Sequence, residues 1–227
     1  MGKGKGVQRM FNTIAGRYDL MNRVMTMGQD QKWRKFVVKQ AGDPGSGSIL
    51  DLATGTGDIA SLSRKLYPEC TIIGADFSLN MLREAKKRFS EDEIFWQATD
   101  ANNLPYADDS FDFVTFGYLL RNVDDAVRVL EEVNRVLKKG GRVVCLDTTP
   151  PAKNLLYPFI QMYFRLGIPL LGRLIAKDED AYAYLTGSTM DFYTADALAD
   201  AFRKAGFSGV GFRKFMMGTI AVHWGTK

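Results

Sequence analysis

Two patterns of apolar and polar positions alternate between residues 48 and 148. Short apolar runs, typical of buried strands, are separated by stretches in which apolar residues recur every three or four positions, as in amphipathic helices. We expect strands near residues 48–53, 71–76, 93–98, 111–117 and 141–148, and helices near 58–67, 79–89 and 124–138. This alternation predicts an α/β protein with a doubly wound, mostly parallel sheet.

The helix near 124–138 carries apolar residues at helical spacing, including Val127, Leu130 and Val133. The next residues, Lys138 to Gly141, are two lysines followed by two glycines. Cations and a glycine are typical of the last turn and end of a helix. They therefore predict that this helix continues to residue 138.

The alternation lapses after residue 150 into a long apolar helical segment. It resumes with a helix near 194–205, for which Thr194 is the expected N-cap, followed by strands near 207–215 and 218–224. The short Met217-Gly218 connection predicts an antiparallel hairpin at one edge of a seven-stranded sheet. We therefore expect one domain, residues 1–227, with an N-terminal helical lid over 1–40 and a helical cap insertion over 150–190.

The composition narrows the class of protein. With 46% apolar and 25% charged residues among 227, the chain has the balance of a soluble globular domain. A net charge of +4 without a long Lys/Arg run does not indicate a nucleic-acid binder. Cys70 and Cys145 lie in apolar runs without metal-ligand spacing, so we expect two buried free thiols and no metal site.

The sequence shows no targeting or membrane-spanning pattern. Residues 1–9 are rich in glycine and lysine, and no apolar signal region follows them. The most apolar stretch, Leu155 to Ile175, is interrupted by prolines, glycines and arginines, so a transmembrane helix is not expected there. These patterns predict a cytoplasmic protein.

The segment from Ile49 to Asp58 joins an apolar run to a glycine turn and a helix start. Gly55, Gly57 and Ala60 match the spacing of a dinucleotide fingerprint, with Asp76 about 20 residues further on. Asp51, however, precedes the glycines, where a pyrophosphate would add negative charge to a carboxylate. A cofactor with positive charge, such as S-adenosylmethionine (SAM) with its sulfonium and ammonium groups, fits this loop better.

Polar residues follow the other expected strands. Ligands of open α/β sheets bind beyond the carboxyl ends of the strands, where Asp51, Asp76, Asp100 and Gly117 all fall. Asp76 is expected to accept hydrogen bonds from both ribose hydroxyls, and Asp100 with Ala101 to read an adenine edge. Asp58 is interpreted as the N-cap of the following helix.

These motifs resemble the class I SAM-dependent methyltransferases. Four segments carry the similarity, from the glycine loop to the turn before the fifth strand: Asp51 to Gly57, Asp76, Leu104 to Asp112, and Leu137 to Arg142. The chain is similar, more closely, to the ubiquinone/menaquinone biosynthesis C-methyltransferase (UbiE/MenG) family. The N-terminal motif of that family is matched in this chain by Phe11, Asn12, Ile14, Ala15, Arg17, Tyr18, Asp19 and Asn22, continued by Thr26, Gly28, Trp33 and Arg34. Its later signatures are similar to Arg121-Asn122-Val123, to Pro169 with Gly172, and to Ala181 through Ser188.

The resemblance implies a Rossmann-like methyltransferase fold with SAM as the cofactor. The residues expected to bind the cofactor are Asp51, Thr54, Gly55, Thr56, Gly57, Asp76, Phe77, Asp100, Ala101 and Gly117. It also implies C-methylation of a polyprenylated quinol precursor, either demethylmenaquinol or a benzoquinol of the ubiquinol pathway. The expected catalytic residues are Arg121, Asn122 and Tyr18. A guanidinium stays protonated, so Arg121 would stabilise phenolate character or orient a water rather than act as a base.

The chain departs from the family pattern at two positions expected to border the substrate ring. Leu119-Leu120 replaces the usual Gly-Leu before Arg121, and Asp147 to Pro151 replaces an acidic-aromatic-Ser sequence after the fifth strand. These departures concern the identity of the acceptor more than that of the cofactor. His223, the single histidine, is interpreted as structural because an antiparallel last strand would end at the opposite face.

Three other functions are open at this point. The first is a SAM-dependent methyltransferase acting on another small aromatic or lipid; Phe116 to Arg121 lacks the Asn/Asp-Pro-Pro loop common in amino-group methylation. The second is an NAD-dependent oxidoreductase, disfavoured by Asp51 and by the missing Tyr-x-x-x-Lys pair. The third is a binding module without catalytic activity.

The apolar residues of the Leu155 to Ile175 segment suggest further partners. They predict either a buried cap helix, a groove for a polyprenyl tail, or peripheral contact with the inner face of a membrane. A homodimer is also considered, although no sequence feature fixes the oligomeric state.

Overall fold

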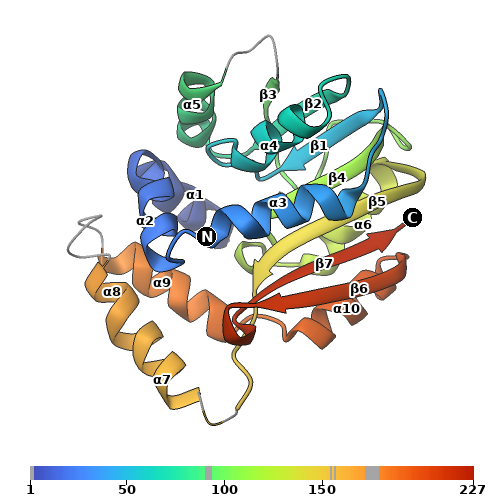
Figure 1. Cartoon of the computed structure of the whole chain (residues 1–227). Coiled ribbons are helices and arrows are strands. Elements are labelled where there is room, and N and C mark those ends of the chain that lie inside the picture. The colour runs from blue at the N-terminus through green and yellow to red at the C-terminus, as the bar shows by residue number, and fades with distance from the viewer. Residues whose placement is uncertain (1–2, 90–93, 154, 156, 172–178) are drawn as a thin grey trace.

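A seven-stranded sheet forms the centre of the computed structural model, which describes residues 3–89, 94–153, 155, 157–171 and 179–227 (Figure 1). The strand order is β3-β2-β1-β4-β5-β7-β6. The strands are β1 (Ser48–Leu52), β2 (Thr71–Asp76), β3 (Phe95–Ala98), β4 (Phe111–Gly117), β5 (Leu137–Thr148), β6 (Ser208–Phe215) and β7 (Ile220–Thr226). β1 to β5 pair in parallel, and β7 pairs antiparallel with both β5 and β6. The expected fold class is confirmed.

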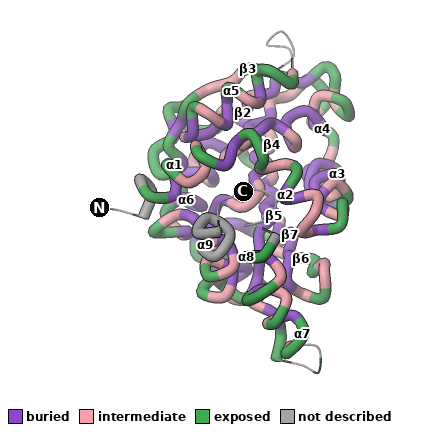
Figure 2. The backbone as a smooth tube through the Cα atoms, turned by 90° about the vertical axis from the view of Figure 1, so that its left-hand side faces the viewer, coloured by how far each residue is buried: buried purple, intermediate pink, exposed green. Residues whose placement is uncertain are grey.

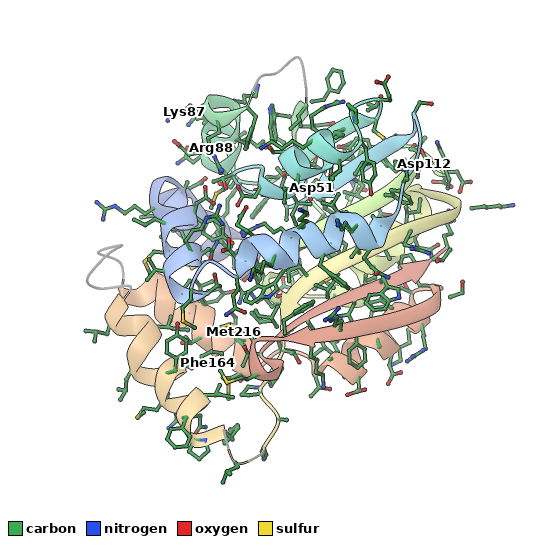
Figure 3. All side chains as sticks on the ribbon, in the orientation of Figure 1. Asp51, Lys87, Arg88, Asp112, Phe164 and Met216 are labelled. Carbon is green, nitrogen blue, oxygen red and sulfur yellow. The ribbon has the colours of Figure 1, made fainter. Side chains whose placement is uncertain are left out.

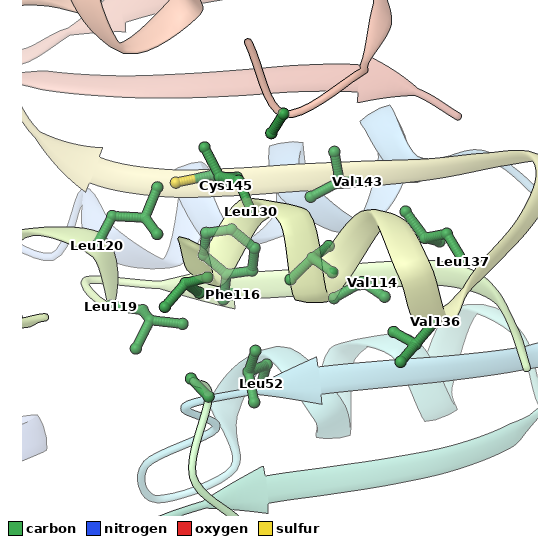
Figure 4. Close-up of a cluster of buried hydrophobic side chains, with 14 of the residues drawn as sticks. Leu52, Val114, Phe116, Leu119, Leu120, Leu130, Val136, Leu137, Val143 and Cys145 are labelled. Atoms are coloured by element: carbon green, nitrogen blue, oxygen red, sulfur yellow. The ribbon is translucent and has the colours of Figure 1, made fainter. Parts of the chain in front are cut away.

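Helices cover both faces of the sheet, which explains why most residues of its central strands are apolar on both sides. On one face lie α3 (Asp30–Ala41) and α4 (Asp58–Leu66); on the other lie α6 (Ala126–Val136) and α10 (Ala195–Lys204). α5 (Leu79–Arg88) packs against β2 and β3. Figure 4 shows the core between β1, β4, β5 and α6, where Leu52, Phe116, Leu130 and Val143 are completely or almost completely buried.

Helices from two distant parts of the chain gather at the edge where the parallel strands end (Figure 1). The N-terminal group is α1 (Lys3–Ile14), η1 (Ala15–Arg17) and α2 (Tyr18–Met25). The second group is α7 (Tyr157–Met162), the π-helical turn η3 (Tyr163–Gly167), α8 (Ile168–Leu171) and α9 (Glu179–Met190). The two groups share one apolar cluster that includes Ile14, Met21, Phe164 and Leu185; Phe164 is labelled in Figure 3.

The expected end of the helix before β5 was wrong. α6 ends at Val136, and β5 begins at Leu137, so Lys138 to Gly141 belong to the strand. Lys138 pairs with Asp112 of β4 at 2.8 Å, and the Gly140 N–H donates to the Lys227 carbonyl at 3.1 Å. These residues form an irregularity within β5, because Gly140 has a φ of +77° and the pairing with β4 shifts from Phe111–Leu137 to Phe113–Arg142. Contacts with β4 and with the C-terminal residue hold this segment in the sheet, whereas the local pattern of cations and glycines suggested a continuing helix.

The C-terminal expectations are confirmed. Thr194 caps α10 by accepting the Ala197 N–H at 3.2 Å, and β6 and β7 form the antiparallel edge hairpin through η5 (Met216–Gly218).

Figure 2 shows the buried strands at the centre and the exposed turns of α7 at the lower end. Of the apolar segment 155–175, residues 156 and 172–175 lie outside the described residues. No described helix is long and apolar enough to cross a membrane.

Candidate functional site

The loop after β1 turns sharply through left-handed backbone conformations. Ala53, Gly55 and Gly57 have φ values of +51°, +58° and +87°. A Cβ on Gly57 would lie 2.6 Å from the Trp96 ring, while a Cβ on Gly55 would meet no atom within 4 Å. Glycine is therefore needed at the two positions for different reasons. At position 57 both the positive φ and the contact with Trp96 exclude a Cβ, whereas at position 55 only the positive φ disfavours one.

Asp51 holds this loop from inside the protein. Its carboxylate accepts hydrogen bonds from Thr54 Oγ1 at 2.5 Å, Thr115 Oγ1 at 2.9 Å and the Ala60 N–H at 3.1 Å. Complete burial raises the pKa of Asp51 to about 7, against the effect of these hydrogen bonds. The side chain does not line the adjacent cavity, so the expected direct contact of Asp51 with a ligand does not follow from the geometry.

Asp76 links the glycine loop to the end of β2. It accepts the Gly55 N–H at 2.8 Å and the Ser78 N–H at 2.7 Å, one on each carboxylate oxygen. Burial raises the pKa of Asp76, while these N–H groups act in the opposite direction. Because each carboxylate oxygen can accept a second hydrogen bond, the fixed carboxylate still has capacity for a ligand hydroxyl.

A cavity opens where these strands end, as expected for an α/β sheet. Ten of the sequence-predicted residues line it: Tyr18, Thr54, Gly55, Thr56, Asp76, Phe77, Asp100, Ala101, Gly117 and Asn122. Three do not: Asp51, Gly57 and Arg121. The structure therefore brings together most of the residues predicted for cofactor and substrate, although they come from five separate parts of the chain.

The charges around the cavity are mainly negative. Four carboxylates line it, from Asp58, Asp76, Asp100 and Asp124. Arg34 of α3 is the one cationic side chain among the described residues of the lining. Such a lining suits a ligand with net positive charge and opposes one that carries a diphosphate.

Two tyrosines border the cavity on the side of β4. Tyr18, in the first turn of α2, contacts the Phe11 ring edge-on with centroids 5.8 Å apart. Tyr118 follows β4 with a φ of +59°, unusual for a non-glycine residue, and its N–H donates to the Leu146 carbonyl at 2.7 Å. Burial raises the pKa of both phenols, so both are neutral hydrogen-bonding groups at neutral pH. The prediction from sequence did not include Tyr118.

Arg121 lies behind Tyr118, in a second cavity that shares Val123 and Asp124 with the first. Its guanidinium pairs with Asp147, with 3.6 Å between Nε and Oδ1. Burial raises the pKa of Asp147 to about 6, although Arg121 lowers it. Arg121 was expected to act directly on a ligand, but it does not line the main cavity. The ring of Tyr118, which does line that cavity, contacts the Arg121 guanidinium.

Asn122 lines the first cavity and is hydrogen-bonded to Tyr184, which lines the second. Its amide nitrogen donates to the Tyr118 carbonyl at 2.7 Å, and its amide oxygen accepts the Tyr184 hydroxyl at 3.2 Å. Tyr184 comes from α9, so the second helical group contributes to the same hydrogen-bond chain. The amide nitrogen has a second hydrogen to offer to a ligand.

Asp58 is not the N-cap of α4, as the sequence suggested; Gly57 holds that position and Asp58 is the first helical residue. Its carboxylate pairs with Arg88 at 2.8 Å, with Arg23 at 3.5 Å and with Arg34 at 3.6 Å. Burial opposes ionisation of Asp58, but these arginines prevail and hold its pKa below the usual range. The local pattern missed this network because its members come from α2, α3, α4 and α5.

The N-terminal helices are hydrogen-bonded to the cavity loops. Asp19 of α2 accepts Thr56 Oγ1 at 2.8 Å and Arg88 Nη1 at 2.6 Å. Asn12 of α1 accepts Ser78 Oγ at 2.6 Å on its side-chain oxygen. Figure 3 shows Arg88 reaching from α5 toward these helices. The sequence motif had placed Asn12 and Asp19 in a family signature without indicating these contacts.

His223 lies away from both cavities. It is buried on β7 near the rings of Phe202 and Phe212, with Nε2 2.8 Å from the Ala195 carbonyl. Burial lowers the pKa of His223 to about 4, so the ring is neutral at neutral pH. This position agrees with the structural role expected for it.

The chain is similar to known methyltransferases both in sequence and in fold. A model of the ubiE/COQ5 methyltransferase family matches residues 1–227. The chain is 68% identical over 227 residues to a ubiquinone/menaquinone biosynthesis C-methyltransferase UbiE of Desulfotalea psychrophila, covering all of this chain and 92% of that protein. It is 40% identical over 226 residues to a demethylmenaquinone methyltransferase of Lactiplantibacillus plantarum, covering 97% and 95% of the two chains.

Two solved structures share the fold. A SAM-dependent methyltransferase of Thermotoga maritima aligns with a TM-score of 0.68 at 23% identity, over 96% of this chain and 98% of the other. A phosphoethanolamine N-methyltransferase of Haemonchus contortus, solved with S-adenosyl-L-methionine, aligns with a TM-score of 0.64 at 15% identity, over 86% of this chain and 52% of the other. At these identities the similarity concerns the fold alone.

Proposed function

The chain belongs to the ubiE/COQ5 methyltransferase family, and from this premise we propose that it transfers a methyl group from SAM to a ring carbon of a polyprenylated quinol precursor. The observation that carries the cofactor assignment is the lining of four carboxylates and one guanidinium beside the glycine loop. SAM has two positive groups and one carboxylate, so its net charge complements this lining. NAD carries a diphosphate, which the same carboxylates would repel.

In this proposal the adenosine lies at the ends of β2 and β3. The Asp76 carboxylate, held by two N–H donors, would accept the ribose hydroxyls, and Asp100 with Ala101 would contact the adenine. The sulfonium then lies toward the end of β4, near Gly117 and Leu119. Asp51 acts indirectly, because its three hydrogen bonds hold the loop that the cofactor contacts.

The acceptor ring is proposed to lie beside Tyr18, Leu119 and Asn122, which line the remaining part of the cavity. In the proposed reaction SAM would supply the methyl group: its sulfonium–methyl bond would break while a bond forms between the methyl carbon and a ring carbon. S-adenosylhomocysteine would leave, and the ring carbon would then lose its proton to water. Partial deprotonation of a neighbouring ring hydroxyl raises the electron density at this carbon. Donors near that oxygen lower the barrier because they stabilise the developing negative charge.

Asn122 and Tyr18 are the proposed donors to the ring oxygen. Asn122 is oriented by Tyr118 and Tyr184, and the raised pKa of Tyr18 keeps its phenol protonated. Arg121 contributes positive charge from behind Tyr118, in a buried environment where charge acts over longer distances than in water. The N-terminal helices are proposed to form a lid over the site, joined to the loops by Asp19 and Asn12.

A lipid substrate also suggests contact with a lipid surface, and the α7–α8 segment supports this proposal. Apolar side chains of this segment and of Leu155 just before it face two directions: Ile160, Phe164 and Ile168 are buried, whereas Leu155, Phe159, Met162, Leu166 and Leu170 are each more than half exposed. The exposed set is named here the outer stripe. Four of its members are spaced three or four residues apart, as on one face of a helix.

Charge favours an anionic lipid surface as the partner of the outer stripe. Lys153 and Arg165 are exposed next to it, and the sequence has no acidic residue between Asp147 and Asp178. Isolated exposed apolar residues are common, but a row of this kind indicates an interaction surface. We therefore propose peripheral attachment through the outer stripe, which would bring the cavity close to membrane-dissolved substrate.

A methylation assay tests the proposed function. Purified protein is given SAM and one of three acceptors: demethylmenaquinol, a benzoquinol precursor, or a quinol without a tail. Methylation of a ring carbon in a prenylated acceptor is the expected result, with a lower rate for the tail-less compound. Methyl transfer to oxygen, or binding of NAD without response to SAM, would contradict the proposal.

A further inference from the structure

The charges of the main cavity are distributed along the sheet. Asp76 and Asp100 follow β2 and β3, on one side of β1. Arg34 and Asp58 lie on the other side of the loop, because α3 packs against α4, β4 and β5. A molecule that fills the cavity from β3 to β4 therefore meets carboxylates at one end and an adjacent cation and anion at the other.

SAM has a matching distribution of groups along its length. Its adenosine offers hydroxyl and amino donors, its centre carries the sulfonium, and its amino-acid end carries an ammonium and a carboxylate. With the adenosine at Asp76 and Asp100, the amino-acid end points toward Tyr18, Arg34 and Asp58. A carboxylate bound in a cavity lined by four acidic side chains needs a cation nearby, and Arg34 supplies it among the described lining residues.

We propose that Arg34 binds the α-carboxylate of the cofactor, while Asp58 faces the α-ammonium; this inference rests on the proposed use of SAM. Guanidinium groups recognise carboxylates through parallel N–H donors, which fixes orientation as well as charge. Arg34 thus sets the position of the amino-acid end and, through it, of the sulfonium methyl group.

The surroundings of Arg34 support a prepared site. Its guanidinium is almost completely buried and is held by a hydrogen bond from Nη1 to the buried carboxylate of Asp30. Although burial disfavours the charge, Tyr118, Asp58 and Asp30 raise the pKa of Arg34, so the cation is permanent. A fixed cation in a largely water-excluded place loses little entropy when a carboxylate binds.

Arg23 provides a matched comparison. It pairs with the same two acids, Asp30 and Asp58, but it does not line the cavity. If Arg34 served only to neutralise these acids, replacing either arginine would have similar effects on ligand binding. If Arg34 binds the cofactor, only its own replacement would change the preference for a ligand carboxylate.

Calorimetry with two ligands tests the proposal. SAM and decarboxylated SAM share the adenosine, the sulfonium and the ammonium, and they differ in the carboxylate. The wild-type protein should bind SAM roughly 10- to 100-fold more tightly, the range for a hydrogen bond to a charged group. Arg34→Gln should lose this preference while keeping its affinity for decarboxylated SAM within about 3-fold. Arg23→Gln should keep the wild-type preference.

Each outcome has a defined meaning. Equal weakening of both ligands by Arg34→Gln, or an unchanged preference, would overturn the proposal. If Arg34→Gln does not fold, Arg34→Lys serves instead, with a preference reduced at least about 3-fold because the paired donors are lost. Absence of SAM binding by the wild-type protein would overturn the proposed function as well, whereas SAM binding without quinol methylation would leave the role of Arg34 intact.

Discussion

The guanidinium carbon of Arg121 lies 5.1 Å from the centroid of the Tyr118 ring, and the two residues face different cavities. The ring thus stands between a buried ion pair, Arg121 with Asp147, and the space proposed for the substrate. A cation over an aromatic face is attracted to it, which helps to hold Tyr118 in its unusual backbone conformation. This position outside the main cavity supports the proposed role of Arg121 as a source of positive charge that does not contact the cofactor.

We expect Arg121→Ala to separate catalysis from cofactor binding. Turnover should fall roughly 100- to 1000-fold, the usual effect of removing a group that stabilises developing negative charge. The affinity for S-adenosylhomocysteine should stay within about 3-fold, because Arg121 lies outside the main cavity. Steady-state kinetics and calorimetry measure the two quantities.

The loss of Arg121 leaves the Asp147 carboxylate buried without its partner, which is destabilising. The double variant Arg121→Ala/Asp147→Asn removes this charge and serves as the folding control. A parallel loss of cofactor affinity and turnover in that variant would place Arg121 in the cofactor site and contradict the prediction.

Alanine at the two loop glycines should have unequal effects on stability. Both positions have positive φ, so each substitution should cost about 1–2 kcal/mol from backbone strain. Gly57→Ala should cost roughly 1–3 kcal/mol more, because its Cβ would collide with Trp96, whereas the Gly55 Cβ has space. Urea denaturation of the protein without ligand measures the difference, and equal losses would contradict it.

Disrupting the bond between Asp19 and Arg88 should accelerate cofactor release. Asp19→Asn weakens the connection between α2 and the glycine loop, so S-adenosylhomocysteine should dissociate a few-fold faster in stopped-flow measurements. Both partners are partly exposed, so the coupling energy with Arg88→Gln should be only about 0.2–1 kcal/mol. Lys87→Gln on the same helix is the control, because Lys87 pairs within α5 to Glu84. An unchanged release rate in Asp19→Asn would argue against a lid.

The neutral buried imidazole of His223 should make the protein less stable in weak acid. Its pKa is about 4 when folded and about 6.5 when unfolded, so the unfolded chain binds more protons between these values. Stability is therefore lost as the pH falls from about 6.5 toward 4. His223→Phe should reduce this loss in thermal melts between pH 7.5 and 5, with turnover at neutral pH unchanged. A melting curve with the wild-type pH dependence would show that another group is responsible.

Polar substitutions in the outer stripe should weaken binding to anionic vesicles. The double variant Phe159→Ser/Leu166→Ser exposes no new core surface, because both side chains are already exposed. Co-sedimentation with phosphatidylglycerol vesicles should fall several-fold, while activity on the tail-less quinol is maintained. Phe95→Ser, at an exposed apolar position of β3, is the matched control. Equal binding by all three proteins, or no binding by the wild type, would exclude attachment through this surface.

Local patterns predicted most elements of the fold because strand and helix periodicities are properties of short segments. They failed at Lys138 to Gly141, where contacts with β4 and the C-terminal residue hold an irregular segment in the sheet instead of a helix end. They also assigned Asp58 to a cap, although this residue pairs with arginines of three other helices. Contacts between distant segments leave no periodic signal in the sequence.

The sequence by itself determined the order of strands and helices along the chain and the glycine turn, since these follow from neighbouring residues. It also determined that several acids lie at one edge of the sheet, because parallel strands all end there. Only the tertiary structure decided which way the side chains of that edge face. It turned Asp51 inward to hold the loop, put Arg121 behind Tyr118, and brought Arg34 from α3 into the cavity. The physical reason is that burial and charge pairing depend on packing between elements, and the sequence does not encode that packing locally.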